Sequence, residues 1–259
     1  MDSRLAEYAE STRKSVLGGV VSVLSLVKDK AAYKALHRYY ADKLDAMNKA
    51  DREKDTTQKS ERQEKNWMSW ESIQEVKKEL EKKVAEIKPK KQITAQDFDT
   101  LLEAVVLALY TDIPPRRNQD YQVMMVSKKY GDKNVADVNW LDLTGKKFVF
   151  NVYKPAKTHG QQSVAIPDSL MELLKVYLKH HPGAGNKDFR FLVYSDGSPL
   201  TAVNAITRIL NRVFGKNVGT TMLRHIYLSD KYDIKEMKED AEAMGHTLEV
   251  QKEYMKGKE

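Results

Sequence analysis

A single block of β-prone sequence, set between helical segments, most constrains the fold. Residues 138–166 contain three short runs rich in β-branched and aromatic residues, at Trp140–Leu143, Phe148–Tyr153 and Ser163–Ile166. Gly145 and Gly160 separate these runs, as turn residues separate strands. On both sides of the block, apolar residues recur at helical spacing. The sequence therefore predicts a mainly α chain with one small antiparallel sheet, which is an α+β fold.

The N-terminal part of the chain is predicted to form a helical segment of its own. Between residues 3 and 49, two stretches carry apolar residues every three or four positions. Residues 49–66 are almost purely polar and charged, which predicts a linker. Ser69 and Thr94 stand where helix N-caps are expected, and from Asp168 onward only helical patterns follow. We therefore expect a helical N-terminal segment over residues 1–66 and a second domain over residues 67–259.

Composition excludes several classes of chemistry. The 259 residues include no cysteine, which rules out disulfides, thiolate zinc sites and cysteine nucleophiles. None of the six histidines forms a His-x-x-x-His pair, so no metal site is predicted. The longest apolar stretch, residues 16–27, is too short for a membrane span, and the N-terminus lacks a signal-peptide pattern. The formal net charge of +7 favours polyanionic partners, nucleic acid first. We expect a soluble intracellular protein associated with DNA.

The C-terminal quarter carries the most specific motifs. Leu223-Arg224-His225 is followed by Met244-Gly245-His246, and Tyr254 stands eight positions after that histidine. In order and spacing these elements resemble the final catalytic segment of the tyrosine recombinases and phage-type integrases, and the resemblance extends back to about Asn66. It implies a tyrosine-recombinase catalytic domain that follows a helical core-binding segment. In the family, a histidine or lysine stands three residues before this arginine, whereas the chain has Thr221.

The resemblance also implies a second arginine and a lysine. The segment Tyr110–Tyr121 lies where the family carries Thr-Gly-x-Arg-x-x-Glu, and Arg117 fits the register because Asp120 follows three residues later. Arg116 remains the alternative for this position and is otherwise expected to contact DNA. Lys157 matches the family's lysine in a β-hairpin turn, with Lys154 in reserve.

The chemistry implied for these residues is exchange of a phosphodiester without metal, nucleotide or other cofactor. Arg117 and Arg224 would hold the non-bridging oxygens, since a guanidinium donates two parallel hydrogen bonds and stays charged. Lys157 would protonate the departing 5′ oxygen, and His246 would contact the phosphate or the nucleophile. The phenol of Tyr254 would attack phosphorus and form a 3′-phosphotyrosyl bond.

A further basic feature is independent of the resemblance. Arg208, Arg212 and Lys216 recur every four residues opposite an apolar helix face, which predicts either a phosphate-tracking stripe or an ordinary solvated face. As partners we expect double-stranded DNA and, as in the family, a homo-tetramer on paired sites. A type IB topoisomerase and a DNA-binding protein of the same fold without cleavage activity remain as alternatives.

Overall fold

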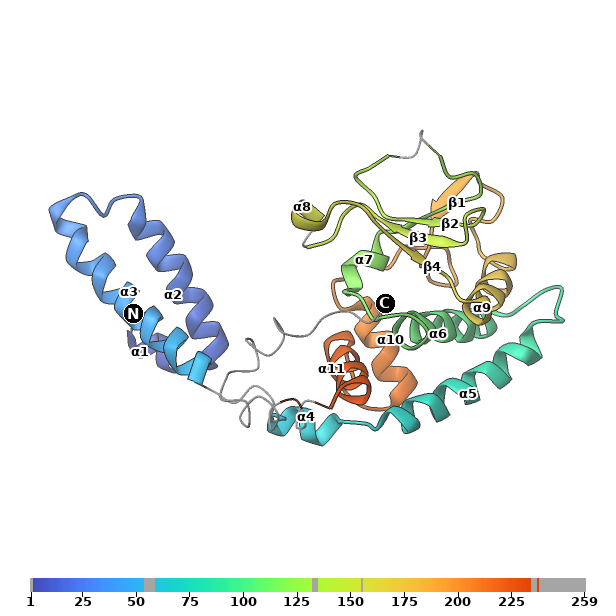
Figure 1. Cartoon of the computed structure of the whole chain (residues 1–259), viewed down its shortest axis with the longest axis horizontal. Coiled ribbons are helices and arrows are strands. Elements are labelled where there is room, and N and C mark those ends of the chain that lie inside the picture. The colour runs from blue at the N-terminus through green and yellow to red at the C-terminus, as the bar shows by residue number, and fades with distance from the viewer. Residues whose placement is uncertain (1, 54–58, 132–134, 155, 234–236, 238–259) are drawn as a thin grey trace. The chain divides into compact units, whose positions relative to one another are not determined.

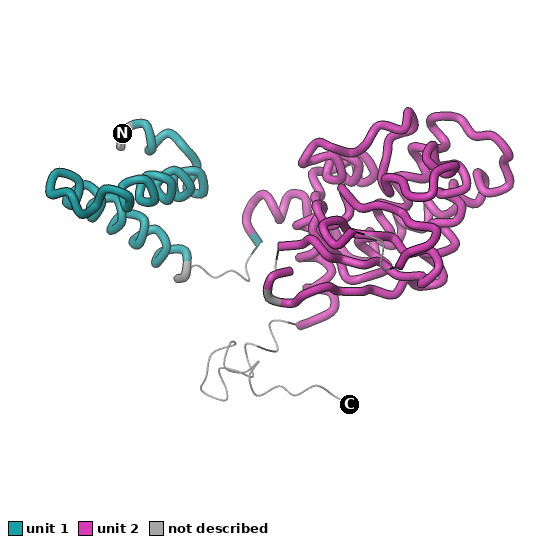
Figure 2. Tube along the Cα trace, turned by 90° about the horizontal axis from the view of Figure 1, so that it is seen from above, with its two compact units in different colours: residues 1–59 teal, residues 60–259 magenta. Residues whose placement is uncertain are grey.

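The computed structural model describes residues 2–53, 59–131, 135–154, 156–233 and 237. The chain divides into two compact units, one over Met1–Lys59 and the other over Ser60–Glu259, as the colours of Figure 2 show. The described part is mostly helical and holds one small sheet, which agrees with the expected α+β class. Each unit is described by itself.

The first unit consists of helices. Helix α1 (Asp2–Ala6) precedes α2 (Glu10–Ser25) and α3 (Ala31–Glu53), and α2 packs along α3. Among the described residues of this unit, Leu5, Leu17 and Tyr40 are the buried hydrophobic ones, with partly buried apolar side chains around them. Helix α3 continues to Glu53, so the predicted linker is wrong at its start: charged residues extend this helix instead of interrupting it.

The second unit begins with a helix inside the other end of the predicted linker. Helix α4 (Glu61–Asn66) starts at a capping box, in which the Ser60 hydroxyl accepts the Gln63 N–H and the Gln63 side chain accepts the Ser60 N–H. Helices α5 (Trp70–Ile87) and α6 (Ala95–Thr111) follow, capped by Ser69 and Thr94 as expected.

Helix α6 forms the centre of the second unit. Its residues from Phe98 to Tyr110 are buried on nearly every side, which is typical of a helix enclosed by other elements. It contacts α5, α9 (Asp168–Lys179), α10 (Ala205–Phe214) and α11 (Thr220–Lys231). Figure 1 shows these helices around α6, with the sheet on one side of it. The apolar run that follows Thr94 is therefore the core of this unit.

The sheet has five strands in the order β4-β3-β2-β1-β5. Strands β2 (Trp140–Asp142), β3 (Lys147–Phe150) and β4 (Gln162–Ala165) lie at the three predicted runs and pair antiparallel. The sequence did not predict β1 (Met125–Ser127) or β5 (Asp188–Arg190), and β1 pairs parallel with β2. The sheet is therefore mixed rather than antiparallel. Residues 128–139 form a connection long enough for the parallel crossover.

His181 is a buried titratable group that follows the end of α9. It is 5% exposed, its ring centroid lies 4.7 Å from that of Phe189, and its Nδ1 accepts the Gly183 N–H at 2.9 Å. Burial lowers the pKa of His181 to about 4. Because the unfolded chain takes up this proton near pH 6.5 and the folded chain only near pH 4, the stability that the neutral ring contributes is complete above pH 6.5 and is lost as the pH falls.

We expect wild type to lose about 2–3 kcal/mol more unfolding free energy between pH 7 and pH 4 than the variant His181→Phe. Phenylalanine keeps an aromatic ring in the cluster but cannot be protonated. Urea denaturation of both proteins at stepwise pH measures the difference, and other titrating groups cancel in it. Parallel stability curves for the two proteins would contradict the prediction.

Candidate active site

The turn that leads from α6 toward the sheet carries two neighbouring arginines in different surroundings. Pro114 and Pro115 precede them in the sequence, and the short helix α7 (Asn118–Gln122) begins directly after Arg117, which is its N-cap residue. Arg116 is engaged: its Nε donates to Asp120 Oδ2 at 2.9 Å, and its guanidinium carbon lies 3.8 Å from the Phe150 ring centroid. The Arg117 side chain is exposed and has no hydrogen bond or ion pair to any described residue. The donors of Arg117 are therefore available to a ligand.

Arg224 lies on α11 and is half-buried. Its Nη2 donates a long hydrogen bond of 3.4 Å to Thr221 Oγ1. Its Nε is buried, and no described residue accepts a hydrogen bond from it. A buried donor without an acceptor is unfavourable by about 1–3 kcal/mol, more for a charged group. Such a donor fits a site that an anionic ligand completes.

Asp120 is a buried carboxylate on α7 that pairs with Arg116 and lies within electrostatic reach of Arg117 and Arg224. Burial raises the pKa of its carboxyl group, and the hydrogen bond and charge of Arg116 oppose that rise, as do the charges of Arg117 and Arg224. Burial also raises the pKa of Tyr110 well above its usual value, and the charge of Arg224 opposes that rise. Of the three arginines, Arg116 contacts the carboxylate, whereas Arg117 and Arg224 act on it through space. A hydrogen bond joins their two segments, because Thr220 Oγ1 on α11 donates at 3.0 Å to Asn118 Oδ1, next to Arg117.

The predicted lysine segment connects β3 to β4. The two strands form the expected antiparallel pair, but residues 151–161 between them include the short helix α8 (Ala156–His159) in place of a tight turn. Lys157 lies on α8, exposed, and makes no hydrogen bond or ion pair with a described residue. Lys154, the reserve candidate, is also exposed.

Lys154 rather than Lys157 shares a hollow with Arg117. This hollow has a volume of about 620 Å³, and it lies between α7, the start of the β3–β4 connection and the segment before α10. Its lining also includes Asp120, Tyr153 and Thr201. An open hollow of this size, with cations from two segments, can receive a phosphodiester and an adjoining sugar. Of the two candidate lysines, Lys154 is therefore the one that lines this hollow together with Arg117.

Two further contacts to Arg116 had no signal in the sequence. Its Nη1 donates to Gln162 Oε1 at 3.0 Å, and its guanidinium carbon lies 4.9 Å from the Tyr153 ring centroid. Gln162 begins β4 and Tyr153 follows β3, so both come to the arginine through strand pairing. Only the pairing of β3 with β4, which local patterns do not specify, brings them there.

The predicted cationic stripe is shorter than expected. Helix α10 ends at Phe214 because Gly215 adopts a left-handed conformation, with φ 61°, so Lys216 lies beyond the helix. Arg212 is paired, its Nε donating to Glu103 Oε1 at 2.6 Å. Arg208 is exposed and unpaired among the described residues. Of the three stripe residues, the structure leaves Arg208 on α10 and Lys216 after it free for phosphate.

The remaining predicted catalytic residues, His246 and Tyr254, lie outside the described residues. Thr221, which stands where the family carries a histidine or lysine, is exposed in the first turn of α11. Its hydroxyl accepts the long hydrogen bond from Arg224. A hydroxyl can orient the guanidinium in this way, but it cannot supply a proton as an imidazolium or ammonium does.

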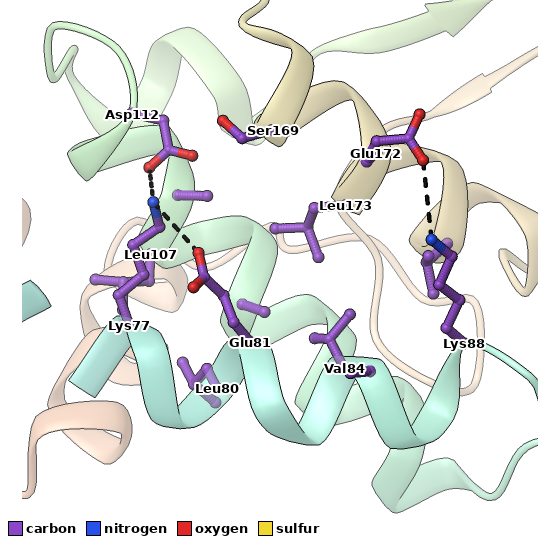
Figure 3. Close-up of a pocket in the computed structure, with 14 residues that line it drawn as sticks. Lys77, Leu80, Glu81, Val84, Lys88, Leu107, Asp112, Ser169, Glu172 and Leu173 are labelled. Atoms are coloured by element: carbon purple, nitrogen blue, oxygen red, sulfur yellow. Dashed lines mark ion pairs between the residues drawn. The ribbon is translucent and has the colours of Figure 1, made fainter. Parts of the chain in front are cut away.

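A second hollow lies between α5, α6 and α9 and has a different character. Figure 3 shows its apolar floor, which includes Leu80, Val84 and Leu107. Its two lysines are neutralised: Lys77 pairs with Asp112 at 2.5 Å and also with Glu81, and Lys88 pairs with Glu172 at 3.9 Å. Paired cations leave little positive potential for a phosphate, so this hollow is not the candidate site.

Comparison with protein-family models, with curated proteins and with solved structures finds no match to this chain. Within the described ranges, no group of three or more histidine or acidic side chains is arranged to hold a metal ion. None of the helices described is both long enough and apolar enough to cross a bilayer. The candidate site therefore rests on the electrostatics around Asp120 and on the hollow that Arg117 and Lys154 share.

Proposed function

We propose that this chain is a site-specific DNA recombinase or integrase that cleaves and rejoins DNA strands through a 3′-phosphotyrosyl intermediate. The observation that carries the proposal is the buried Nε of Arg224, which lacks an acceptor and lies within electrostatic reach of Asp120. A buried guanidinium donor without an acceptor is available to an oxyanion, which would supply the missing partner. The resemblance of the C-terminal motifs supplies the reaction.

In the proposed reaction, the Tyr254 phenolate attacks the scissile phosphorus. The bond from phosphorus to the 5′ oxygen breaks, and a lysine, Lys157 or Lys154, protonates that oxygen as it leaves. Arg117 and Arg224 stabilise the charge on the two non-bridging oxygens, and His246 contacts the phosphate or the phenol. One phosphoester replaces another, so a free 5′-hydroxyl reverses the step without metal, nucleotide or other cofactor.

Double-stranded DNA is the proposed partner, bound by a homo-tetramer on paired sites. Arg116, Arg208, Arg212 and Lys216 are proposed to contact DNA outside the reacting phosphate. The exposure of Arg208 and Lys216 supports this role for them. Arg212 would first have to leave Glu103, and Arg116 is held by Asp120, so these two arginines contribute less.

Covalent trapping tests the proposal. The full chain is incubated with nicked duplexes whose sequence around the nick is randomised, so that the short cleaved fragment diffuses away and the intermediate accumulates. We expect wild type to form an adduct that survives denaturation with detergent and that Tyr254→Phe does not form. Sequencing the attached DNA identifies the target.

Other outcomes assign the alternatives. Duplex binding without any adduct would overturn cleavage and indicate a DNA-binding protein that lacks it. An adduct formed by a monomer that also relaxes supercoiled plasmid, without junction intermediates, would indicate a type IB topoisomerase. An adduct that persists in Tyr254→Phe would show that the nucleophile is another residue.

A further inference from the structure

Asn139 is a fully buried asparagine whose side chain joins two segments of the candidate site. It precedes β2, and its exposed fraction is 0%. Its Nδ2 donates to the backbone oxygens of Asp120, at 2.9 Å, and of Val152, at 2.8 Å. Its Oδ1 accepts the N–H groups of Asn151 and Val152, both at 2.8 Å. The amide therefore makes four hydrogen bonds to main-chain groups of two other segments.

These bonds join the arginine segment to the lysine segment. Asp120 lies on α7, three residues after Arg117, and its carboxylate holds Arg116. Val152 lies two residues before Lys154, at the start of the β3–β4 connection. Both Asp120 and Val152 line the hollow that Arg117 and Lys154 share. Among the described residues, the Asn139 side chain thus joins the backbone of the arginine segment, at Asp120, to the backbone of the lysine segment, at Val152.

Only an amide of this length provides the required set of groups. Its two N–H donors and its oxygen with two lone pairs match two carbonyls and two N–H groups. An aspartate keeps the acceptor but places a carboxylate oxygen against two carbonyl oxygens. An alanine leaves the N–H groups of Asn151 and Val152 and the carbonyls of Asp120 and Val152 without these partners. The β-sheet by itself needs none of these bonds, because Asn151 and Val152 lie after the end of β3.

We infer that Asn139 is a positioning residue, which fixes the distance between the arginines that precede α7 and the lysine of the β3–β4 connection. The inference rests on the proposed function for its chemical consequence. The arginine acts on the non-bridging oxygens and the lysine on the departing oxygen of one phosphate, so a small relative displacement slows the step without removing either group. Misplacement of about 1 Å can slow a positioned reaction by about 10²-fold.

The first experiment compares Asn139→Asp with wild type and with Tyr177→Phe in the trapping assay. Tyr177 is the control because it is also fully buried, and its hydroxyl donates to Phe191 O at 2.9 Å, away from the arginines. We expect Asn139→Asp to form adduct about 10²-fold more slowly at saturating DNA, with its duplex Kd nearly unchanged. Tyr177→Phe is expected to keep both values. A wild-type rate in Asn139→Asp, or a rate that falls only as affinity falls, would overturn the inference.

The second experiment needs no activity and no variant. Hydrogen exchange of the wild-type chain, followed by NMR, should show the amides of Asn151 and Val152 protected to a degree similar to that of Val149 within β3. Their protection must come from the buried Oδ1 of Asn139, because the strand has ended. Exchange as fast as that of exposed loop amides would overturn the inference even if the chain cleaves DNA. If wild type forms no adduct, the proposed function fails, and this measurement alone decides the link.

Discussion

Replacing Arg224 by methionine is expected to slow adduct formation by about 10²–10³-fold at saturating DNA, because a fixed donor to the developing oxyanion is lost. The same change should leave the unfolding free energy unchanged or raise it by up to about 1–3 kcal/mol, because a buried donor without an acceptor is removed. The Nε of Arg224 is buried without an acceptor, and its one hydrogen bond, to Thr221, measures 3.4 Å. Methionine fills similar space and leaves no donor unpaired. Function and stability should therefore separate at this position.

Single-turnover trapping and urea denaturation measure the two effects of Arg224→Met. Arg208→Met is the matched control, since it removes an exposed arginine of α10 that makes no ion pair among the described residues. We expect this control to weaken DNA binding and its salt dependence but to keep the rate at saturation. If Arg224→Met reacts as fast as wild type, the arginines around Asp120 are not the active site. If it unfolds far more easily, Arg224 has a structural role instead.

Tyr121→Ala is expected to lower the unfolding free energy by about 3–5 kcal/mol, as loss of a large buried aromatic ring generally does. Tyr121 is 0% exposed, and its ring packs edge-on against Tyr110, Phe148 and Phe150, with centroids 5.7–6.1 Å apart. It thereby connects α6, α7 and the sheet. Because Phe150 is the ring on which Arg116 lies, the cavity left by alanine should also disturb the arginine segment.

Tyr121→Phe tests the reason for that loss. The Tyr121 hydroxyl is buried, and no described residue forms a hydrogen bond with it. Removing it should leave the unfolding free energy unchanged or raise it by up to about 1 kcal/mol, because an unpaired polar group is then no longer buried. Chemical denaturation followed by circular dichroism compares the two variants. A clear loss of stability in Tyr121→Phe would show that the hydroxyl has a partner, and the packing account would then be incomplete.

The sequence predicted the helices and strands whose signals lie in neighbouring residues. Ser69 and Thr94 cap α5 and α6, because a side-chain oxygen followed by a long apolar period marks a helix start from adjacent residues alone. Strands β2, β3 and β4 overlap the three β-prone runs, although β3 ends at Phe150, three residues before the end of its run. The capping box formed by Ser60 and Gln63 is also a local signal. It did not lead to a predicted helix because the charged residues around it are equally typical of a linker.

The missed features depend on contacts between distant residues. Strands β1 and β5 pair with each other, and β1 also pairs with β2, so both depend on residues that are distant in the sequence. The parallel pairing of β1 with β2 has no local signature. The end of α10 was readable, since Gly215 is a typical helix terminator, yet the four-residue spacing of the basic residues suggested continuation to Lys216.

The candidate site also contains residues that the sequence indicates and residues that only the folded structure reveals. The motifs indicated Arg117 and Arg224, and the charges of both act on the buried Asp120. The sequence favoured Arg117 over Arg116 only through the spacing to Asp120, whereas the structure shows Arg116 stacked on Phe150 and Arg117 exposed. Asn139 has no motif, and its contacts arise only once the sheet has formed. The chemistry of the proposed reaction indicates which residue types to look for, whereas the residues that position them, such as Asn139, are found only in the folded structure.

The central place of α6 has a consequence for how the protein is made. The helix is synthesised early, but α10 and α11, which cover part of it, follow roughly one hundred residues later. At ordinary translation rates of about 5–20 residues per second, its apolar side chains wait several seconds for those helices. A ribosome-bound chain that stops before residue 205 should therefore recruit chaperones at α6, and release of the completed chain should end that association.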